Sequence, residues 1–156
     1  MMHPFMSAGF ALLPENMQSP AAMGMLHAIG MQESRFLHRR QIRGTARGFW
    51  QFEKAGIAGV LNHPATAVTI RRILVRLRYG LSVEESHAAV EHNDALACCY
   101  ARLLLWTLPD ALPGPDEPEE GWRQYLAAWN PGRPRPETWN GYFREALRLS
   151  REGTWI

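Results

Sequence analysis

Lysine, cysteine and long apolar runs are scarce in this chain. Lys54 is the single lysine among the 17 basic residues, so arginine carries nearly all of the positive charge. The two cysteines, Cys98 and Cys99, are neighbours, which excludes an ordinary disulfide between distant segments, and no metal-ligand spacing surrounds them. We therefore expect both to be buried as small apolar residues, in a protein made in a reducing compartment and without a metal or other cofactor.

The sequence also lacks the apolar segments that serve membrane insertion and export. No run approaches the length of a membrane-spanning helix. Residues 1–13 are apolar but have neither the basic leader nor the small-residue cleavage site of a signal peptide. We expect no stable membrane insertion, and a protein made in the cytoplasm that reaches an outside target only when another protein exports or releases it.

What is present is typical of one globular domain, 1–156. The chain has 156 residues, of which 46% are hydrophobic and 21% charged, and this balance supports a core without metal or disulfides. We expect it to fold alone as a monomer. The formal net charge of +2 suits an anionic partner, and charge alone leaves nucleic acid, an acidic membrane surface and a cell-wall polymer open.

Apolar periodicity predicts a mainly α fold. Ser19 followed by Pro20 marks a helix start, and Ser82 followed three residues later by Glu85 has the pattern of a capping box. The helix at 93–108 is apolar over much of its surface, so we expect it to be central. The predicted helices are 21–32, 66–79, 82–90, 93–108, 121–129 and 137–151, the last with Trp139, Phe143, Leu147 and Leu149 in the core. Residues 43–59 are expected to be loop-rich because of their glycines, and 109–120 to be an exposed loop because of its prolines and acids.

Glu33 is the residue that fits acid catalysis. It follows an apolar helix, precedes Phe36, and would lie against an aromatic segment at 49–52. Such surroundings disfavour a charged carboxylate and raise its pKa, which glycosidic bond cleavage requires of the group that protonates the leaving oxygen. A glutamate near a helix end is more often solvated, so this residue alone does not decide the function.

Four segments together carry more information than Glu33. They contain Glu33-Ser34-Arg35-Phe36, then a glycine-rich loop with Phe49-Trp50-Gln51, then a helix from Asn93 to Tyr100, then Ala128-Trp129-Asn130-Pro131-Gly132. In order and approximate separation these resemble the E-S-R-F, G-L-M-Q, N-x-x-x-G-x-x-Y and A-Y-N-A-G segments of the lysozyme-like superfamily, in particular soluble lytic transglycosylases and goose-type lysozymes. The resemblance covers roughly two-thirds of the chain.

The resemblance implies a lysozyme-like domain with a glycan-binding cleft. By position, Glu33 matches the catalytic acid, Gln51 the glutamine that lines the cleft, and Trp129 with Asn130 the aromatic and asparagine of the last turn. Ser34 belongs to the first segment and is included among the substrate-binding residues. Phe49 and Trp50 stand where the family has leucine and methionine, so their rings either stack on sugars or pack in the core.

Three departures from the family pattern bear on the site. Pro131 replaces an alanine, which stiffens the turn. Trp129 replaces a tyrosine whose hydroxyl reaches the catalytic region in transglycosylases, so we expect that hydroxyl to be missing. Arg43 replaces a small polar residue and adds positive charge beside the expected cleft.

Glu53 separates two mechanisms. Transglycosylases have methionine two residues after the loop glutamine, whereas goose-type lysozymes have aspartate there. A second carboxylate favours hydrolysis, because it can orient a water on the opposite sugar face, while transglycosylases use the substrate's own hydroxyl to close an anhydro ring. Alternatively, Glu53 pairs with Arg47 or Lys54 at the surface.

The expected function is therefore cleavage of the β-1,4 bonds between N-acetylmuramic acid and N-acetylglucosamine in peptidoglycan, in a phage or prophage endolysin acting on the periplasmic cell wall after release. One alternative keeps the fold without the chemistry, as a silent peptidoglycan-binding or phage structural protein. The other is a nucleic-acid-binding module built on a basic helix, which the four segments disfavour. Its arginines are Arg71, Arg72, Arg76 and Arg78.

Overall fold

The structure is a computed structural model that describes residues 3–153, so both ends of the predicted domain lie partly outside the described residues. Within this range the chain is mainly helical and forms no named strand, which confirms the predicted mainly α class. The helices are α1 (Pro4–Leu12), α2 (Pro20–Glu33), α3 (Lys54–Asn62), α4 (Ala67–Arg76), α5 (Val83–His92), α6 (Asp94–Trp106), α7 (Pro118–Trp129) and α8 (Pro136–Glu152), with a 3-10 helix at Glu15–Met17.

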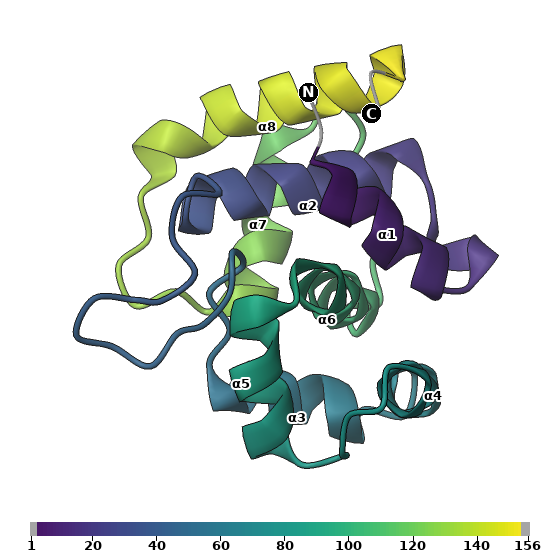
Figure 1. Cartoon of the computed structure of the whole chain (residues 1–156). Helices are drawn as coiled ribbons and strands as arrows, with labels where there is room; N and C mark the ends of the chain where they lie inside the picture. Colours follow the sequence, from purple (N-terminus) through teal and green to yellow (C-terminus); the bar gives the residue numbers. More distant parts are fainter. Residues whose placement is uncertain (1–2, 154–156) are drawn as a thin grey trace.

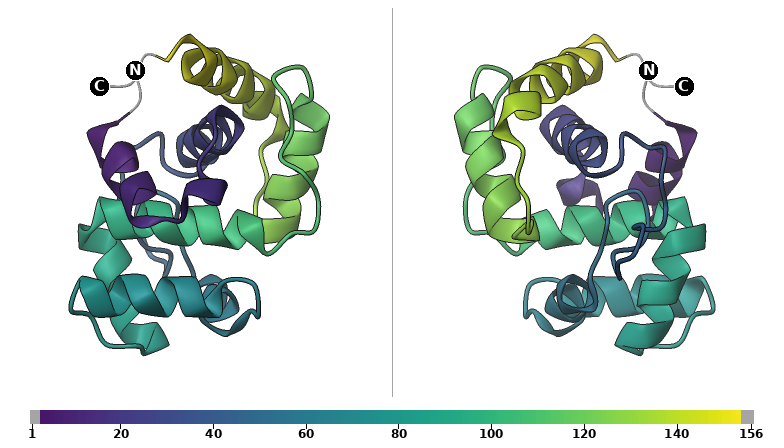
Figure 2. Two further views of the ribbon diagram at one scale, coloured as in Figure 1. Left: turned by 90° about the vertical axis from the view of Figure 1, so that its right-hand side faces the viewer. Right: turned by 90° about the vertical axis from the view of Figure 1, so that its left-hand side faces the viewer.

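Helix α6 lies between two groups of helices. Figure 2 shows it crossing the middle of the molecule, with α1, α2 and α8 on one side and α3, α4 and α5 on the other. Its residues from Leu96 to Leu105 are all buried, and the side chain of Asn93 accepts a hydrogen bond from the Leu96 amide to cap its first turn. The central position predicted for this helix is confirmed.

Helix α2 is the second buried helix and carries the candidate acid at its end. The Ser19 hydroxyl caps it by accepting from the Ala22 amide, and Pro20 takes the first turn, as the sequence predicted. Apolar residues occur all round α2 because α8 packs along it while α6 lies beneath (Figure 1). The core positions predicted on α8 are all buried.

Helices α1 and α3 correct the sequence expectations. Helix α1 was not predicted, because its short apolar segment has little helical periodicity; it packs on α6 through Met6 and Phe10. The cysteines are buried, as predicted, and the Cys99 thiol donates to the Gly9 carbonyl of α1. The loop-rich stretch at 43–59 ends at Glu53, because the small residues of α3 form a helix on the α5 and α6 surface.

The acidic, proline-rich segment at 109–120 is only partly a loop. Pro118 opens α7 at its first turn, three residues before the predicted start, where a missing amide hydrogen costs nothing. Pro113 and Pro118 are buried rather than exposed. No helix in the described part of the chain is long and apolar enough to cross a lipid bilayer.

Candidate functional site

Glu33 ends α2 beside a cleft, with its carboxylate accepting a hydrogen bond of 2.5 Å from the Tyr125 hydroxyl of α7. Burial raises the pKa of Glu33 from 4.5 to about 7, while the hydrogen bond from Tyr125 and the charge of Arg135 act in the opposite direction. Desolvation is the dominant influence. A large share of the carboxyl groups is therefore protonated near neutral pH, as a general acid needs.

Tyr125 corrects the expectation that this chain has no tyrosine hydroxyl near the catalytic region. The ring of Tyr125 stacks on Trp139 of α8, with centroids 5.4 Å apart and planes 11° from parallel. Trp139 is itself held by a hydrogen bond from its indole nitrogen to the Pro118 carbonyl. Tyr125 precedes Trp129 by one helical turn, so the helical spacing at 125–129 is the signal that sequence reasoning missed.

The cleft has a volume of about 440 Å³ and brings together distant parts of the chain. A neighbouring hollow of about 310 Å³ shares Gln51, Glu53, Trp129 and Asn130 with it and continues along α3 past Gly56 and Gly59. The cleft itself is lined by Gln32, Glu33, Gln41, Ala46, Gln51, Glu53, Tyr125, Trp129, Asn130, Pro131, Gly132, Arg133 and Arg135. Of the predicted site residues, Glu33, Gln51, Glu53, Trp129 and Asn130 all line it.

The turn at 48–52 places Gln51 in the cleft. Gln51 has a positive φ of 51°, which an ordinary side chain adopts only when its surroundings hold it there. The surroundings do so from three directions. Ser34 donates to the Phe49 carbonyl, Trp50 donates to the Leu26 carbonyl of α2, and Trp129 donates to the Trp50 carbonyl.

Phe49 and Trp50 are core residues, which corrects their assignment as substrate-binding. Trp50 is fully buried and Phe49 is 5% exposed. Both rings pack against Phe36 and Phe5, and the guanidinium of Arg39 covers the Phe49 ring at 4.2 Å. Neither ring has a free face for a sugar. Of the two interpretations offered for Phe49 and Trp50, core packing is therefore the correct one.

Ser34 is also structural. Its side chain is buried, and its hydroxyl oxygen accepts from the Phe36 amide as well as donating to Phe49. It sits at the end of α2, where it links the helix to the loop that follows. The expectation that Ser34 contacts substrate is therefore wrong, because its buried hydroxyl is already hydrogen-bonded to Phe49 and Phe36.

The backbone of Asn130 ends helix α7, and its side chain is free to contact a ligand in the cleft. It ends α7 in the left-handed conformation, with φ 45° and ψ 56°, which asparagine tolerates better than most residues. The residue is exposed and faces the cleft beside the half-buried Trp129. The described contacts leave its amide available to a ligand, because the structure gives it no side-chain hydrogen bond.

Glu53 is exposed in the cleft and does not form either of the surface pairs considered for it. Its carboxylate accepts a hydrogen bond of 2.6 Å from the Thr45 hydroxyl. Among the described residues, Arg47 instead lies 3.7 Å from Glu91, and Lys54 has no ion pair with Glu53. Glu53 is thus a solvent-facing second carboxylate in the same cleft as Glu33.

Arginines border one end of the cleft. Arg133 and Arg135 line it, whereas Arg43 is exposed on the loop outside the lining. The backbone of Arg135 is held by Gln32, whose amide donates to the Arg135 carbonyl at 2.9 Å and accepts from Thr138. Gln32 is buried, so this network joins the end of α2 to the start of α8.

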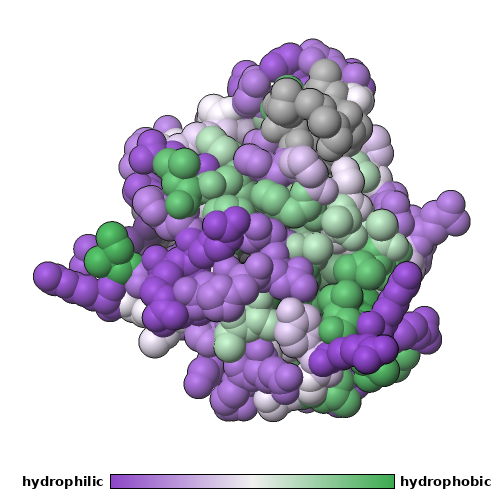
Figure 3. Space-filling view, viewed as in Figure 1, coloured by the Kyte–Doolittle hydropathy of each residue, from purple (hydrophilic) through white to green (hydrophobic). Residues whose placement is uncertain are grey.

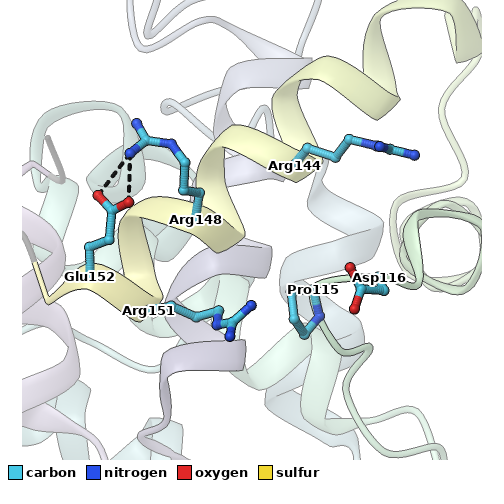
Figure 4. A pocket seen from close by; sticks show the side chains of 6 residues that line it. All are labelled: Pro115, Asp116, Arg144, Arg148, Arg151 and Glu152. Atoms are coloured by element: carbon cyan, nitrogen blue, oxygen red, sulfur yellow. Dashed lines mark hydrogen bonds and ion pairs between the residues drawn. The ribbon is translucent and has the colours of Figure 1, made fainter.

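A separate hollow, of about 590 Å³, lies away from Glu33 between α8 and residues 115–116. Figure 4 shows its arginines on α8, with Arg148 joined to Glu152. Arg148 also pairs with Glu145, so its charge is locally compensated. None of the predicted site residues lines this hollow.

In comparisons with known proteins, no family model, curated protein or solved structure matches the chain.

Proposed function

We propose that this protein is a glycosidase that cleaves β-1,4 bonds between N-acetylmuramic acid and N-acetylglucosamine in peptidoglycan, on a lysozyme-like fold. The observation that carries the proposal is the carboxyl group of Glu33, whose pKa is about 7 and which receives the Tyr125 hydrogen bond at the edge of a cleft. The sequence resemblance described above supplies the class of substrate.

In the proposed reaction Glu33 is the general acid. Its proton moves to the bridging oxygen as the bond from that oxygen to the sugar C1 breaks, and the electron pair of the bond leaves with the oxygen. The sugar ring that remains is positively charged at C1 and must be captured by an oxygen nucleophile. Glu33, now a carboxylate, accepts the hydrogen bond from Tyr125, which stabilises its charged form.

The nucleophile distinguishes two forms of the proposal. In hydrolysis a water attacks C1, and Glu53 supplies the base that takes its proton. In lytic transglycosylation a hydroxyl of the same sugar attacks, giving an anhydro ring, and Glu33 takes back the proton. The exposed second carboxylate in the cleft supports the hydrolytic form.

The shape of the site supports a polymer substrate. The cleft at Glu33 and the hollow along α3 share four lining residues, so together they form a continuous groove. Asn130 offers its amide to acetamido and hydroxyl groups of the sugars, and Gln51 offers its amide oxygen, since its amide nitrogen already donates to the Gly48 carbonyl. Trp129 offers a half-buried ring at the point where the two hollows meet.

The test is mass spectrometry of fragments released from purified peptidoglycan by the wild type, by Glu33→Gln and by Glu84→Gln. Glu84 is an exposed glutamate on α5 outside the cleft lining and serves as a control for the loss of one carboxylate. We expect Glu33→Gln to reduce release by about 10²–10⁴-fold, the usual contribution of a general acid, and Glu84→Gln to match the wild type.

The products separate the forms of the proposal. Reducing-end muropeptides support hydrolysis, and Glu53→Gln should then lose most of the activity. Anhydro-muropeptides support transglycosylation, and Glu53→Gln should then retain it. If the wild type releases no more than Glu33→Gln, the enzymatic proposal fails, and binding of the wild type to sedimented peptidoglycan then supports the catalytically silent wall-binding alternative.

A further inference from the structure

Helix α4 carries positive charge without any acidic neighbour along the chain. No aspartate or glutamate occurs between Glu53 and Glu84, a segment that includes all of α4. Arg72, Arg76 and Arg78 are exposed and have no carboxylate partner among the described residues, whereas four exposed arginines elsewhere are paired with nearby acids. These four are Arg39, Arg40, Arg123 and Arg148. Arg144 and Arg151 of α8 are also exposed without an ion pair among the described residues, but acids lie beside them along the chain, so the acid-free surroundings distinguish α4.

The same helix presents apolar side chains to solvent. Val68 is 67% exposed and Val75 is 65% exposed, although the opposite face of α4 is buried through Ile70, Ile73 and Leu74. Residues seven apart lie on one side of a helix, so the valines form a short stripe. Leu81, just beyond the helix, is also exposed.

The arginines border this stripe. At about 100° per residue, Arg71 projects on one side of the two valines, and Arg72 and Arg76 project on the other. Figure 3 shows apolar surface beside projecting hydrophilic side chains over α4, at the lower right. Figures 1 and 2 show α4 on the opposite side of the molecule from the loop 34–53, so a partner on α4 leaves the cleft open.

We propose that the outer face of α4 binds peripherally to the surface of an anionic phospholipid bilayer. Arg72 and Arg76 contact lipid phosphates, while Val68 and Val75 enter the boundary between headgroups and acyl chains. An apolar stripe bordered by arginines is the pattern of a helix that lies in a membrane interface. Nucleic acid is the less suitable partner. A nucleic-acid backbone bound across α4 would place phosphates against Val68 and Val75, whose side chains cannot donate hydrogen bonds to them.

This inference is independent of the glycosidase proposal and is tested by sedimentation of the full chain with vesicles. One set is made of equal parts phosphatidylglycerol and phosphatidylcholine, and the other of phosphatidylcholine alone. The variants are the doubles R72Q/R76Q and V68S/V75S. R144Q/R151Q is the control, because it removes the same charge from exposed arginines on α8.

We expect the wild type to sediment with the anionic vesicles only. Loss of Arg72 and Arg76 should weaken binding by about thirty-fold, and loss of the two valines by about tenfold, while R144Q/R151Q should bind like the wild type. All of the altered residues are exposed, and circular dichroism checks that each variant is folded.

Three outcomes would overturn the proposal. Absence of wild-type binding, or equal binding to both vesicle sets, removes the anionic bilayer as the partner. Undiminished binding of V68S/V75S shows that charge alone acts, without insertion. Loss of labelled duplex DNA binding in R72Q/R76Q, with vesicle binding unchanged, assigns α4 to nucleic acid instead.

Discussion

Glu33 lies where burial and polar contacts act on one carboxyl group in opposite directions. Removal from water favours the protonated form, whereas the Tyr125 hydroxyl and the Arg135 charge favour the ionised form. A general acid uses both influences in turn, because it begins the reaction protonated and ends its first step as a carboxylate. Burial therefore raises the pKa of Glu33, Tyr125 and Arg135 reduce the rise, and the Tyr125 hydrogen bond also positions the carboxyl group.

Tyr125→Phe should move the titration of Glu33 upward. The phenyl ring keeps the stack on Trp139, but the carboxylate loses the hydrogen bond that stabilises its charge. The alkaline limb of the pH profile of kcat/KM should move to higher pH, with a lower maximum, and carbon-detected NMR of the Glu33 carboxyl should report the same rise without substrate. Tyr142→Phe, which removes a hydroxyl on α8 without a described partner, is the control; equal profiles for both variants would contradict the role given to Tyr125.

Glu33→Gln should stabilise the fold in a pH-dependent way. Below about pH 4.5 the Glu33 carboxyl group is protonated in both the folded and the unfolded chain. Between that pH and its folded pKa of about 7, only the unfolded chain ionises, so the folded wild type becomes less stable as the pH rises. The loss amounts to about 3 kcal/mol and is complete above pH 7. Urea unfolding of the two proteins should agree at pH 4.5 and diverge by that amount at pH 8.

His27 makes the paired comparison necessary. Burial lowers its pKa from 6.5 to about 4, so the fold loses stability from this group as pH falls from 6.5 toward 4. This trend opposes that of Glu33 and obscures it in the wild type alone. Because His27 is present in both proteins, it cancels in the difference, and a constant difference across pH would refute the assigned Glu33 titration.

At the scale of the element, α2 is fitted closely to the loop that follows it. Phe36 has a positive φ of 55° and folds its ring back over Gly30, where a Cβ atom would lie 2.1 Å from the ring. Small residues on α2 also admit α8, since a Cβ on Gly24 would lie 2.9 Å from Leu147. The end of α2 is consequently anchored from both sides, which holds Glu33 at the cleft.

Gly30→Ala and Gly141→Ala should have opposite effects on stability. Alanine is the better helix former at both positions, by about 1 kcal/mol. At Gly141 of α8 nothing lies within 4 Å of the added methyl group, so we expect a gain of that order. At Gly30 the methyl group displaces the Phe36 ring, and we expect a net loss of about 2 kcal/mol. Urea unfolding measures both, and equal signs would contradict the close packing of Phe36 on α2.

At the scale of the molecule, one buried cluster connects the elements. It includes Phe10 of α1, Ile29 of α2, Leu74 of α4 and Phe143 of α8. The cleft depends on this continuity, because its residues come from the end of α2, the loop 41–53, the end of α7 and the segment after α7. The same buried cluster that stabilises the fold therefore also holds the cleft residues in place.

Unfolding should be a single cooperative transition. Far-ultraviolet circular dichroism and tryptophan fluorescence should give coincident urea curves, since Trp50, Trp129 and Trp139 report on the loop, α7 and α8 within one core. Separate transitions would show that α8 or the α3 to α5 group unfolds independently, and would contradict one domain over 1–156.

Much of the helical framework was predictable because its signals are local. Serine before proline marks the start of α2, and apolar spacing marks the buried face of α8. The helical spacing of Met25, Ile29 and Phe36 places Glu33 near a helix end. Helices α1 and α3 were not predictable in this way. Their short segments are stabilised by packing on α6 and α5 rather than by their own pattern.

The sequence by itself determined which residues are available: an apolar helix ending in Glu33, a glutamine in a glycine-rich loop, a second carboxylate at Glu53 and a basic helix free of acids. Only the tertiary structure decided which of them meet. It buries Phe49 and Trp50 and engages the Ser34 hydroxyl in a hydrogen bond to Phe49. It also places Tyr125 in contact with the Glu33 carboxylate, 92 residues away in the sequence. Burial and long-range hydrogen bonds depend on how helices pack, and helix packing involves neighbours that no local pattern specifies.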